Sequence, residues 1–219
     1  MPPTPTPRIR LRSHLLANNP AATPEATVAH FGAMQAQDYR GALWAVGVRT
    51  RAVDEREVEA AIEARRIVRC WPMRGTLHFV AAPDVRWMLE LLAPRVLERN
   101  RPRLEREFDL DRATLRRARR IIERTLKREA AATRPELYAA LDAGGVATAR
   151  GRGLHVLFAL AHDLAICFGA RRGKQPTFVL LDAWVPPSAP KTKEEALAAL
   201  AARYRASHAP ASVDDFAWW

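Results

Sequence analysis

The sequence predicts a mainly α-helical protein with small β-hairpin wings, an α+β fold built from tandem winged-helix units. Helical hydrophobic periodicity covers most of the 219 residues. Two apolar strand–turn–strand patterns, at residues 67–80 and 165–185, each follow a group of helices. Hydrophobic residues make up 48% of the chain, which is enough to form packed cores. The same order of elements begins a third time near the C-terminus, so we expect a third unit that is truncated.

We expect a flexible tail at residues 1–7 and the first winged-helix unit at residues 8–92. Thr23 and Pro24 have the residue types of a helix cap and a first turn, so they mark the start of one helix. The helices are followed by an alternating stretch rich in β-branched and aromatic residues, which predicts the first hairpin. The helices of this unit are expected at residues 8–16, 25–34, 38–50 and 54–66.

The second winged-helix unit is expected at residues 93–186. It contains a basic helix capped by Asp111, and its hairpin joins two apolar strands through the sequence GARRGKQP. Residues 187–219 form the truncated third unit, where a short helix starts at Ser212 with Asp215 three residues further on. The longer helices of these two units are expected at residues 109–129, 133–145, 148–164 and 191–208.

The charge of the chain favours a polyanionic partner. Thirty-five Lys and Arg residues against 24 Asp and Glu give a net charge of +11, and nucleic acid is the first candidate partner. Residues 95–128 alone hold 13 basic and 6 acidic side chains. An arginine-rich composition is also typical of proteins from GC-rich genomes, so composition by itself leaves both explanations open.

The placement of the basic residues favours double-stranded DNA. Arg116, Arg120 and Arg124 recur every four residues on the basic helix, opposite its apolar stripe, which is the pattern of a ridge that contacts phosphates. A solvated surface face is the alternative. Further cations lie at the start of the next helix and at the tip of the second hairpin, where an ordinary polar turn is the alternative. These candidate DNA contacts are Arg150, Arg152, Arg171, Arg172 and Lys174.

Two glutamines between helical segments are the candidate catalytic residues. Gln35 and Gln37 can face the same side only if the backbone between them is extended. A glutamine is a poor general base, but its carbonyl oxygen can hold a water while its NH₂ group fixes a second contact. Alternatively, both amides bond backbone groups at a helix end. Asp38 is placed to cap the following helix.

Residues near the glutamines are candidates for DNA contact. Arg40 could contact a phosphate, while Tyr39 is suited to a core. Arg74 and His78 are expected on one side of the strand with sequence RGTLH, with Arg74 as a phosphate contact and His78 as a hydrogen-bonded structural residue. The six tryptophans lie mostly in apolar contexts and are best assigned to the core. The short helix that starts at Ser212 could not bury Phe216, Trp218 and Trp219 alone.

Several classes of protein are disfavoured by composition. No apolar run has the length of about 18 residues that a membrane span needs, and the N-terminus has no apolar signal region. Cys70 and Cys167 lie in apolar strands, which predicts buried free thiols in a reducing compartment. With no Cys/His cluster we expect no metal and no cofactor. We expect a cytoplasmic, nucleoid-associated protein, and a monomer because no heptad run is present.

The stretches MQAQDYRGALWAV, RCWPMRGTLHFV, LLDAWVP and SVDDFAWW resemble signatures of the AlkZ-like winged-helix DNA glycosylases, a bacterial family. The resemblance runs from about residue 8 onward. It implies tandem winged helices around a basic channel for duplex DNA, and excision of N-alkylated purines, including bulky adducts and crosslinks at guanine N7. It also implies catalysis by a glutamine pair around one apolar residue, matched here by Gln35 and Gln37. In another branch of the family the second residue is an aspartate. In an enzyme of this family Asp38 could stabilise a positively charged sugar instead of capping the helix, and Tyr39 and Arg40 could contact a displaced base or its phosphate.

This resemblance implies a monofunctional, hydrolytic enzyme. A guanine alkylated at N7 is cationic and leaves as a neutral base, so positioning of a water is the main requirement for catalysis. No lysine lies near the glutamine pair in the sequence, which argues against Schiff-base chemistry. Two alternatives remain. The protein could be a winged-helix regulator that binds DNA without catalysis, or an inactive fragment, because the resemblance ends before the usual end of the family.

Overall fold

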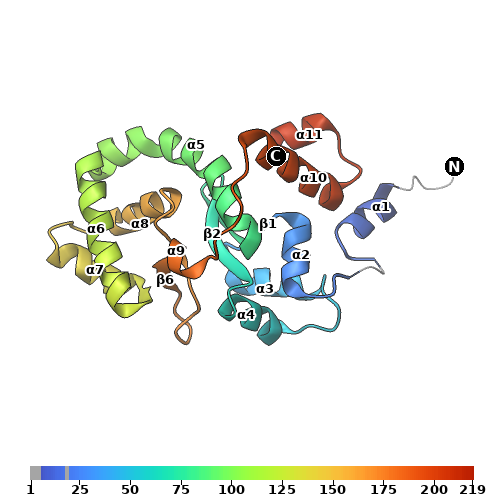
Figure 1. Cartoon of the computed structure of the whole chain (residues 1–219), viewed down its shortest axis with the longest axis horizontal. Helices are drawn as coiled ribbons and strands as arrows, with labels where there is room; N and C mark the ends of the chain where they lie inside the picture. The colour runs from blue at the N-terminus through green and yellow to red at the C-terminus, as the bar shows by residue number, and fades with distance from the viewer. Residues whose placement is uncertain (1–5, 18–19) are drawn as a thin grey trace.

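The computed structural model of the protein describes residues 6–17 and 20–219 and shows mostly helices around two small sheets (Figure 1). Residues 1–5 of the expected tail lie outside the described residues. Thr6 and Pro7, assigned to the tail, instead begin helix α1 (Thr6–Ser13). No helix of the described part is long and apolar enough to cross a membrane.

The first unit has the connectivity of a winged helix, in which three helices and a short strand precede a hairpin. Its three strands are antiparallel and lie in the order β1-β3-β2. The predicted helix over residues 25–34 is too long: it ends at Phe31 because Gly32 adopts a φ of 75°, and Ala33 and Met34 enter a strand. The elements after α1 are α2 (Pro24–Phe31), β1 (Ala33–Gln35), α3 (Tyr39–Gly47), α4 (Glu55–Glu63), β2 (Ile67–Met73) and β3 (Thr76–Ala81).

The second unit repeats this connectivity. Its sheet order, β4-β6-β5, places the strands as β1-β3-β2 places them in the first unit. The predicted Asp111 cap is confirmed, since its carboxylate accepts a hydrogen bond from the Thr114 amide. The prediction of tandem winged-helix units is therefore confirmed. The elements are α6 (Arg112–Glu129), β4 (Ala132–Thr133), α7 (Arg134–Ala143), α8 (Arg152–His162), β5 (Ile166–Phe168), β6 (Thr177–Leu180) and α9 (Leu181–Trp184).

A 27-residue helix, α5 (Ala82–Phe108), joins the two units. The division expected between residues 92 and 93 falls inside this helix. Pro94 and Pro102 lie within it; each lacks an amide donor and favours a bend. In Figure 1 the helix curves over α8.

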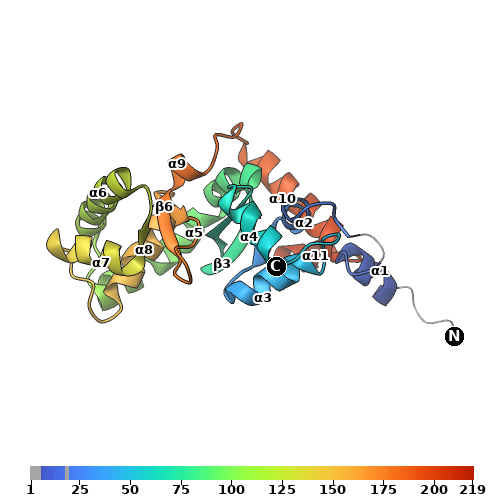
Figure 2. The same ribbon diagram turned by 90° about the horizontal axis from the view of Figure 1, so that it is seen from below.

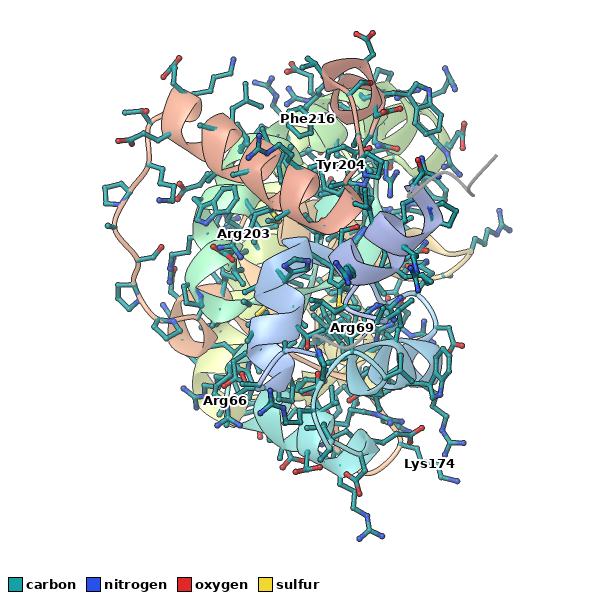
Figure 3. All side chains as sticks on the ribbon, turned by 90° about the vertical axis from the view of Figure 1, so that its right-hand side faces the viewer. Arg66, Arg69, Lys174, Arg203, Tyr204 and Phe216 are labelled. Atoms are coloured by element: carbon teal, nitrogen blue, oxygen red, sulfur yellow. The ribbon has the colours of Figure 1, made fainter. Side chains whose placement is uncertain are left out.

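The C-terminal helix α10 (Lys193–His208) packs against α2, α5 and α1, and α11 (Val213–Trp218) packs against α10. Both begin with a capping box, and the predicted cap formed by Ser212 and Asp215 is confirmed. Arg203, seen on α10 in Figure 3, donates hydrogen bonds to the Ala29 carbonyl and to Asp84, whose carboxylate is 2.9 Å away. These contacts tie α10 to both α2 and α5.

One apolar core is shared by the two units. Val68 and Cys70 of β2 belong to the same buried cluster as Cys167 of β5 and Val179 of β6. Both cysteines are buried free thiols, as predicted, and burial raises the pKa of the Cys70 thiol to about 12. The interface between the units is therefore an interior rather than a surface contact.

The expectation that the tryptophans lie in the core is wrong for Trp44, whereas the exposure of Trp218 agrees with the expectation that the short C-terminal helix cannot bury its apolar face alone. Trp71 and Trp87 are buried, but Trp44 is 65% exposed and Trp218 is 89% exposed. Trp44 lies on α3, whose buried side is formed by smaller residues, Ala42, Leu43 and Val46. Its position on the opposite side of the helix explains its exposure.

Candidate active site

The two candidate catalytic glutamines lie at the end of an extended segment. Gln35 is the last residue of β1 and pairs with His78 of β3, and the Ala36 amide continues the ladder with a 2.7 Å hydrogen bond to the Leu77 carbonyl. Ala36 is fully buried, whereas Gln35 and Gln37 are exposed. Because side chains alternate along extended backbone, both amides lie on the solvent side. The predicted extended link is confirmed.

The two amides have different surroundings. The Gln37 side-chain oxygen Oε1 accepts a 2.9 Å hydrogen bond from the Leu77 amide. A backbone N–H can only donate, so this bond fixes the amide orientation and leaves the Gln37 NH₂ group free. No described residue forms a hydrogen bond with the side-chain amide of Gln35. The side chain of Gln37 is therefore fixed in orientation and offers its NH₂ group as a donor. The side chain of Gln35 offers both a donor and an acceptor.

Arg69 fixes the backbone of the glutamine motif. Its Nε and Nη2 donate to the Ala36 carbonyl at 3.0 and 2.8 Å, and Nη2 also reaches the Gln37 carbonyl at 3.3 Å. The sequence analysis missed this residue. Its signal is an arginine inside an otherwise apolar strand, a position that a charged side chain occupies only when it has partners.

Aromatic rings of both units enclose the Arg69 guanidinium. It lies 5.5 Å from the centre of the Tyr39 ring and 5.0 Å from that of Phe168 on β5. Both distances suit cation–π attraction. Arg69 therefore connects the glutamine motif of the first unit to the sheet of the second.

Tyr39 is part of this packed cluster. Arg171 of the second hairpin lies 4.6 Å from its ring centre and 3.6 Å from Glu59, and the Tyr39 hydroxyl donates to Glu59 at 3.4 Å. Burial and the nearby Glu59 carboxylate raise the pKa of Tyr39 to about 12. Figure 2 shows the hairpin of β5 and β6 between the two units. The Tyr39 ring is thus occupied by protein contacts, as the core interpretation expected.

A pocket of about 420 Å³ opens beside the motif, between the first hairpin and the second unit. It shares Arg69 and Leu77 with the surroundings of Gln37. Arg134, which is exposed and which the sequence analysis did not single out, adds a positive charge to its wall. Its other lining residues include Trp71, Leu154, Phe168, Gln175 and Phe178.

The expected alignment of Arg74 with His78 on one strand face is wrong. Arg74 and Gly75 form a two-residue turn with φ of 53° and 71°, and Arg74 is exposed. His78 is 2% exposed, and its Nδ1 lies 2.9 Å from the Thr76 carbonyl. Burial lowers the pKa of His78 to about 4, so a neutral imidazole fills this site at neutral pH.

Asp38 occupies the N-cap position of α3 but makes no capping hydrogen bond. Its carboxylate is exposed and leans over Gly41, where an added Cβ would lie 2.7 Å from Oδ2. It forms neither a hydrogen bond nor an ion pair with any described residue. A free carboxylate therefore lies one residue beyond Gln37.

Three of the predicted DNA contacts are engaged within the protein. Arg152 donates hydrogen bonds to the Phe108 and Asp109 carbonyls, both at 2.7 Å, and so stabilises the C-terminal end of α5. Arg172 pairs with Glu136 at 2.7 Å, and Arg171 with Glu59. Of the three hairpin-tip cations, Lys174 alone has no such bond among the described residues, and it projects outward in Figure 3.

The remaining predicted cations are exposed. Within residues 6–17 and 20–219 they form neither hydrogen bonds nor ion pairs, so their donors are available to phosphates. Trp44 is on the same exposed side of α3 as Arg40, one helical turn away, and is a further candidate contact that the sequence analysis placed in the core. These free cations are Arg40, Arg74, Arg116, Arg120, Arg124, Arg150 and Lys174.

The repeated connectivity defines a tandem winged-helix protein, and its first unit carries an exposed pair of side-chain amides. Residues 28–219 match the family described as DNA glycosylase AlkZ-like, and the chain belongs to this family. The fold is similar to that of Streptomyces sahachiroi DNA glycosylase AlkZ, with a TM-score of 0.77 and 22% sequence identity. That similarity covers 96% of this chain and 58% of the Streptomyces protein. No curated protein matches the sequence.

Proposed function

We propose that the protein is a DNA repair glycosylase that hydrolyses the N-glycosidic bond of cationic N-alkylated purines, above all 7-alkylguanine. The observation that carries this proposal is the exposed pair Gln35 and Gln37 on one side of an extended segment in a chain of the AlkZ-like family. Crosslinks at guanine N7 belong to the same class, since alkylation there also makes the base a better leaving group.

The two side-chain amides have different roles in orienting the attacking water. Gln35 has a free Oε1 that can accept a hydrogen bond from the water, while the free NH₂ group of Gln37 donates to the water or to the sugar. The two roles differ because the Leu77 amide already donates to Oε1 of Gln37, whereas Oε1 of Gln35 accepts no hydrogen bond from a described residue. The cationic base departs without protonation, so orientation of water is sufficient.

The surroundings of the pair support this mechanism. Arg69 and Leu77 hold the backbone and one amide in place before substrate arrives, so little ordering is left for the reaction step. Asp38, which is free of capping contacts, can stabilise the positive charge that develops on the sugar. No metal or cofactor is part of the proposal.

Double-stranded DNA is the proposed partner, bound by a monomer through the free cations. Arg116, Arg120 and Arg124 follow α6, and Lys174 lies at the hairpin tip. Contacts of this kind are to phosphates, so affinity should fall steeply with salt. Arg150, next to the start of α8, extends the set.

The test is release of 7-methylguanine from methylated duplex DNA under single-turnover conditions. We expect Gln35→Ala and Gln37→Ala to reduce the rate by about 10²-fold or more, while Asn100→Ala, which removes a carboxamide of α5 that bonds the Val96 carbonyl, leaves it unchanged. Equal rates for wild type and both motif variants would refute the assignment. Sequence-dependent binding without any base release would instead indicate a winged-helix regulator.

A further inference from the structure

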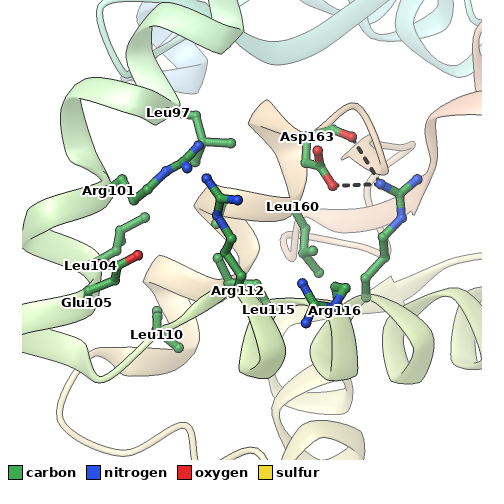
Figure 4. Close-up of a pocket in the computed structure, with 12 residues that line it drawn as sticks. Leu97, Arg101, Leu104, Glu105, Leu110, Arg112, Leu115, Arg116, Leu160 and Asp163 are labelled. Atoms are coloured by element: carbon green, nitrogen blue, oxygen red, sulfur yellow. Dashed lines mark hydrogen bonds and ion pairs between the residues drawn. The ribbon is translucent and has the colours of Figure 1, made fainter.

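A second pocket lies away from the glutamine pair, between α5, α6 and α8 (Figure 4). Its volume is about 200 Å³. The floor and walls are aliphatic, and Leu104, Leu110 and Leu160 are almost completely buried. The remaining apolar lining residues are Leu97, Leu115 and Ala159.

The pocket follows from the course of α5. The pocket residues that belong to α5 lie between Leu97 and Glu105. This part of the helix follows Pro94 and contains Pro102, and prolines inside a helix favour a bend. The bent helix passes over α8 and then reverses at Asp109, whose φ of 50° ends it. Leu110, in the link to α6, closes one end. The course of the backbone from α5 to α6 therefore creates the pocket.

The mouth of the pocket carries an excess of positive charge. Arg101, Arg112 and Arg116 line it, and none of the three forms a hydrogen bond or ion pair with another described residue. The fourth arginine, Arg119, is already held by Asp163 at 2.6 Å and by Glu123 at 2.7 Å. This leaves Glu105 as an acidic side chain at the mouth against three unpaired cations.

Figure 4 shows Arg101 and Arg112, which come from different helices, directed toward the same opening. Guanidinium groups of like charge repel, so their convergence favours an anion between them. An anion at the mouth would remove the repulsion and gain charge-assisted hydrogen bonds from two planar donors.

We propose that this pocket binds a small amphipathic anion, with a compact aromatic or branched aliphatic body and one carboxylate group. The body enters the leucine-lined hollow, and the carboxylate meets Arg101 and Arg112 at the mouth, with Arg116 beside them. The volume lies below the range of about 300–1,000 Å³ typical of sites for drug-sized ligands, which restricts the body to one ring or a short branched chain. The floor offers no side-chain donor or acceptor and no aromatic ring, so it does not suit a nucleobase.

The same chemistry has two sources: a free carboxylic acid, or the terminal carboxylate of a peptide that ends in an apolar residue. Two matched pairs of probes distinguish them, 4-phenylbutyrate with 4-phenylbutyramide, and a pentapeptide ending in free leucine with its C-terminal amide. Binding is measured by titration calorimetry and by ligand-detected NMR on the whole chain.

The variants separate the pocket from the rest of α6. Arg101→Gln combined with Arg112→Gln removes the cations at the mouth without touching the floor. Arg120→Gln combined with Arg124→Gln is the matched control, because it removes two cations of α6 that do not line the pocket. Leu115→Gln places a polar group in the apolar wall at a half-buried position.

We expect at least one acid to bind about tenfold or more tightly than its amide. The pocket double variant and Leu115→Gln should each weaken binding about tenfold, with no change for the control pair. Preference for the peptide over 4-phenylbutyrate identifies a protein partner, and the reverse identifies a free acid. The proposal is overturned if neither acid binds at millimolar concentration, if acids and amides bind equally, or if the control pair reduces binding as much as the pocket pair. None of these results depends on glycosylase activity.

Discussion

Replacement of Arg69 by lysine should loosen the glutamine motif while keeping the charge. The guanidinium makes two hydrogen bonds to the Ala36 carbonyl and one to the Gln37 carbonyl, and it lies between the rings of Tyr39 and Phe168. An ammonium group is a point charge that cannot reproduce this planar fork. At least one charge-assisted bond, about 1.5–3 kcal/mol, and part of the ring contacts, about 0.5–1 kcal/mol each, are lost.

The free energy of unfolding should therefore fall by about 2–4 kcal/mol, measured by urea denaturation. Local loosening is read from hydrogen exchange of the Leu77 amide, which is bonded to Gln37 Oε1. We expect this amide to exchange at least about tenfold faster, since each tenfold corresponds to about 1.4 kcal/mol of opening free energy. Release of 7-methylguanine should slow in parallel, through the rate of the chemical step rather than through DNA affinity.

Arg66→Lys is the matched control. Arg66 precedes the same strand and pairs with Glu25 at 3.2 Å, but its side chain is 49% exposed, so the change should cost only about 0–1 kcal/mol. If Arg69→Lys unfolded at the same urea concentration as Arg66→Lys and left Leu77 exchange unchanged, the positioning role of Arg69 would be refuted.

Four further outcomes are expected. Gln35→Leu removes the acceptor for the attacking water without touching the bond between Gln37 Oε1 and the Leu77 amide, so it should retain wild-type stability and Leu77 protection yet lose base release; slow release with lost protection would instead indicate a structural defect. Burial lowers the pKa of His78 from 6.5 to about 4, so the unfolded chain binds a proton in this window that the folded chain does not, and stability should fall by roughly 3 kcal/mol between pH 6.5 and 4. His78→Gln should lack this part of the pH dependence in urea titrations, while a parallel profile would contradict it. Trp44→Ala should weaken duplex binding by about 1–3 kcal/mol without loss of stability, if the exposed ring stacks on a base. Arg120→Gln should weaken DNA binding equally for all sequences and reduce the slope of log affinity against log salt by about one, whereas Arg172→Gln should not change the slope, because Arg172 is paired with Glu136.

The sequence was most informative where structure is decided locally. The hairpin over residues 67–80 was predictable from its alternation, and the Asp111 and Ser212 caps from residue type and spacing. The extended link between Gln35 and Gln37 was also predictable, because a helix pattern ends before it and another begins after it.

Features that depend on tertiary contacts were missed. The two prolines of α5 normally argue against a 27-residue helix, and packing against β2 and α8 overrides that local preference. Arg69 bonds a carbonyl 33 positions away in the chain. The tip arginines Arg171 and Arg172 find their acidic partners on other elements, so a count of charges overestimated how many are free for DNA.

The buried cluster around Cys70 and Cys167 has a consequence for how such repeats evolve. Both winged-helix units supply side chains to this interior, so a unit excised from the chain would expose aliphatic side chains to water. The two repeats therefore cannot be shuffled as independent modules, and a residue change in one must be compensated in the other. Both should melt in a single calorimetric transition.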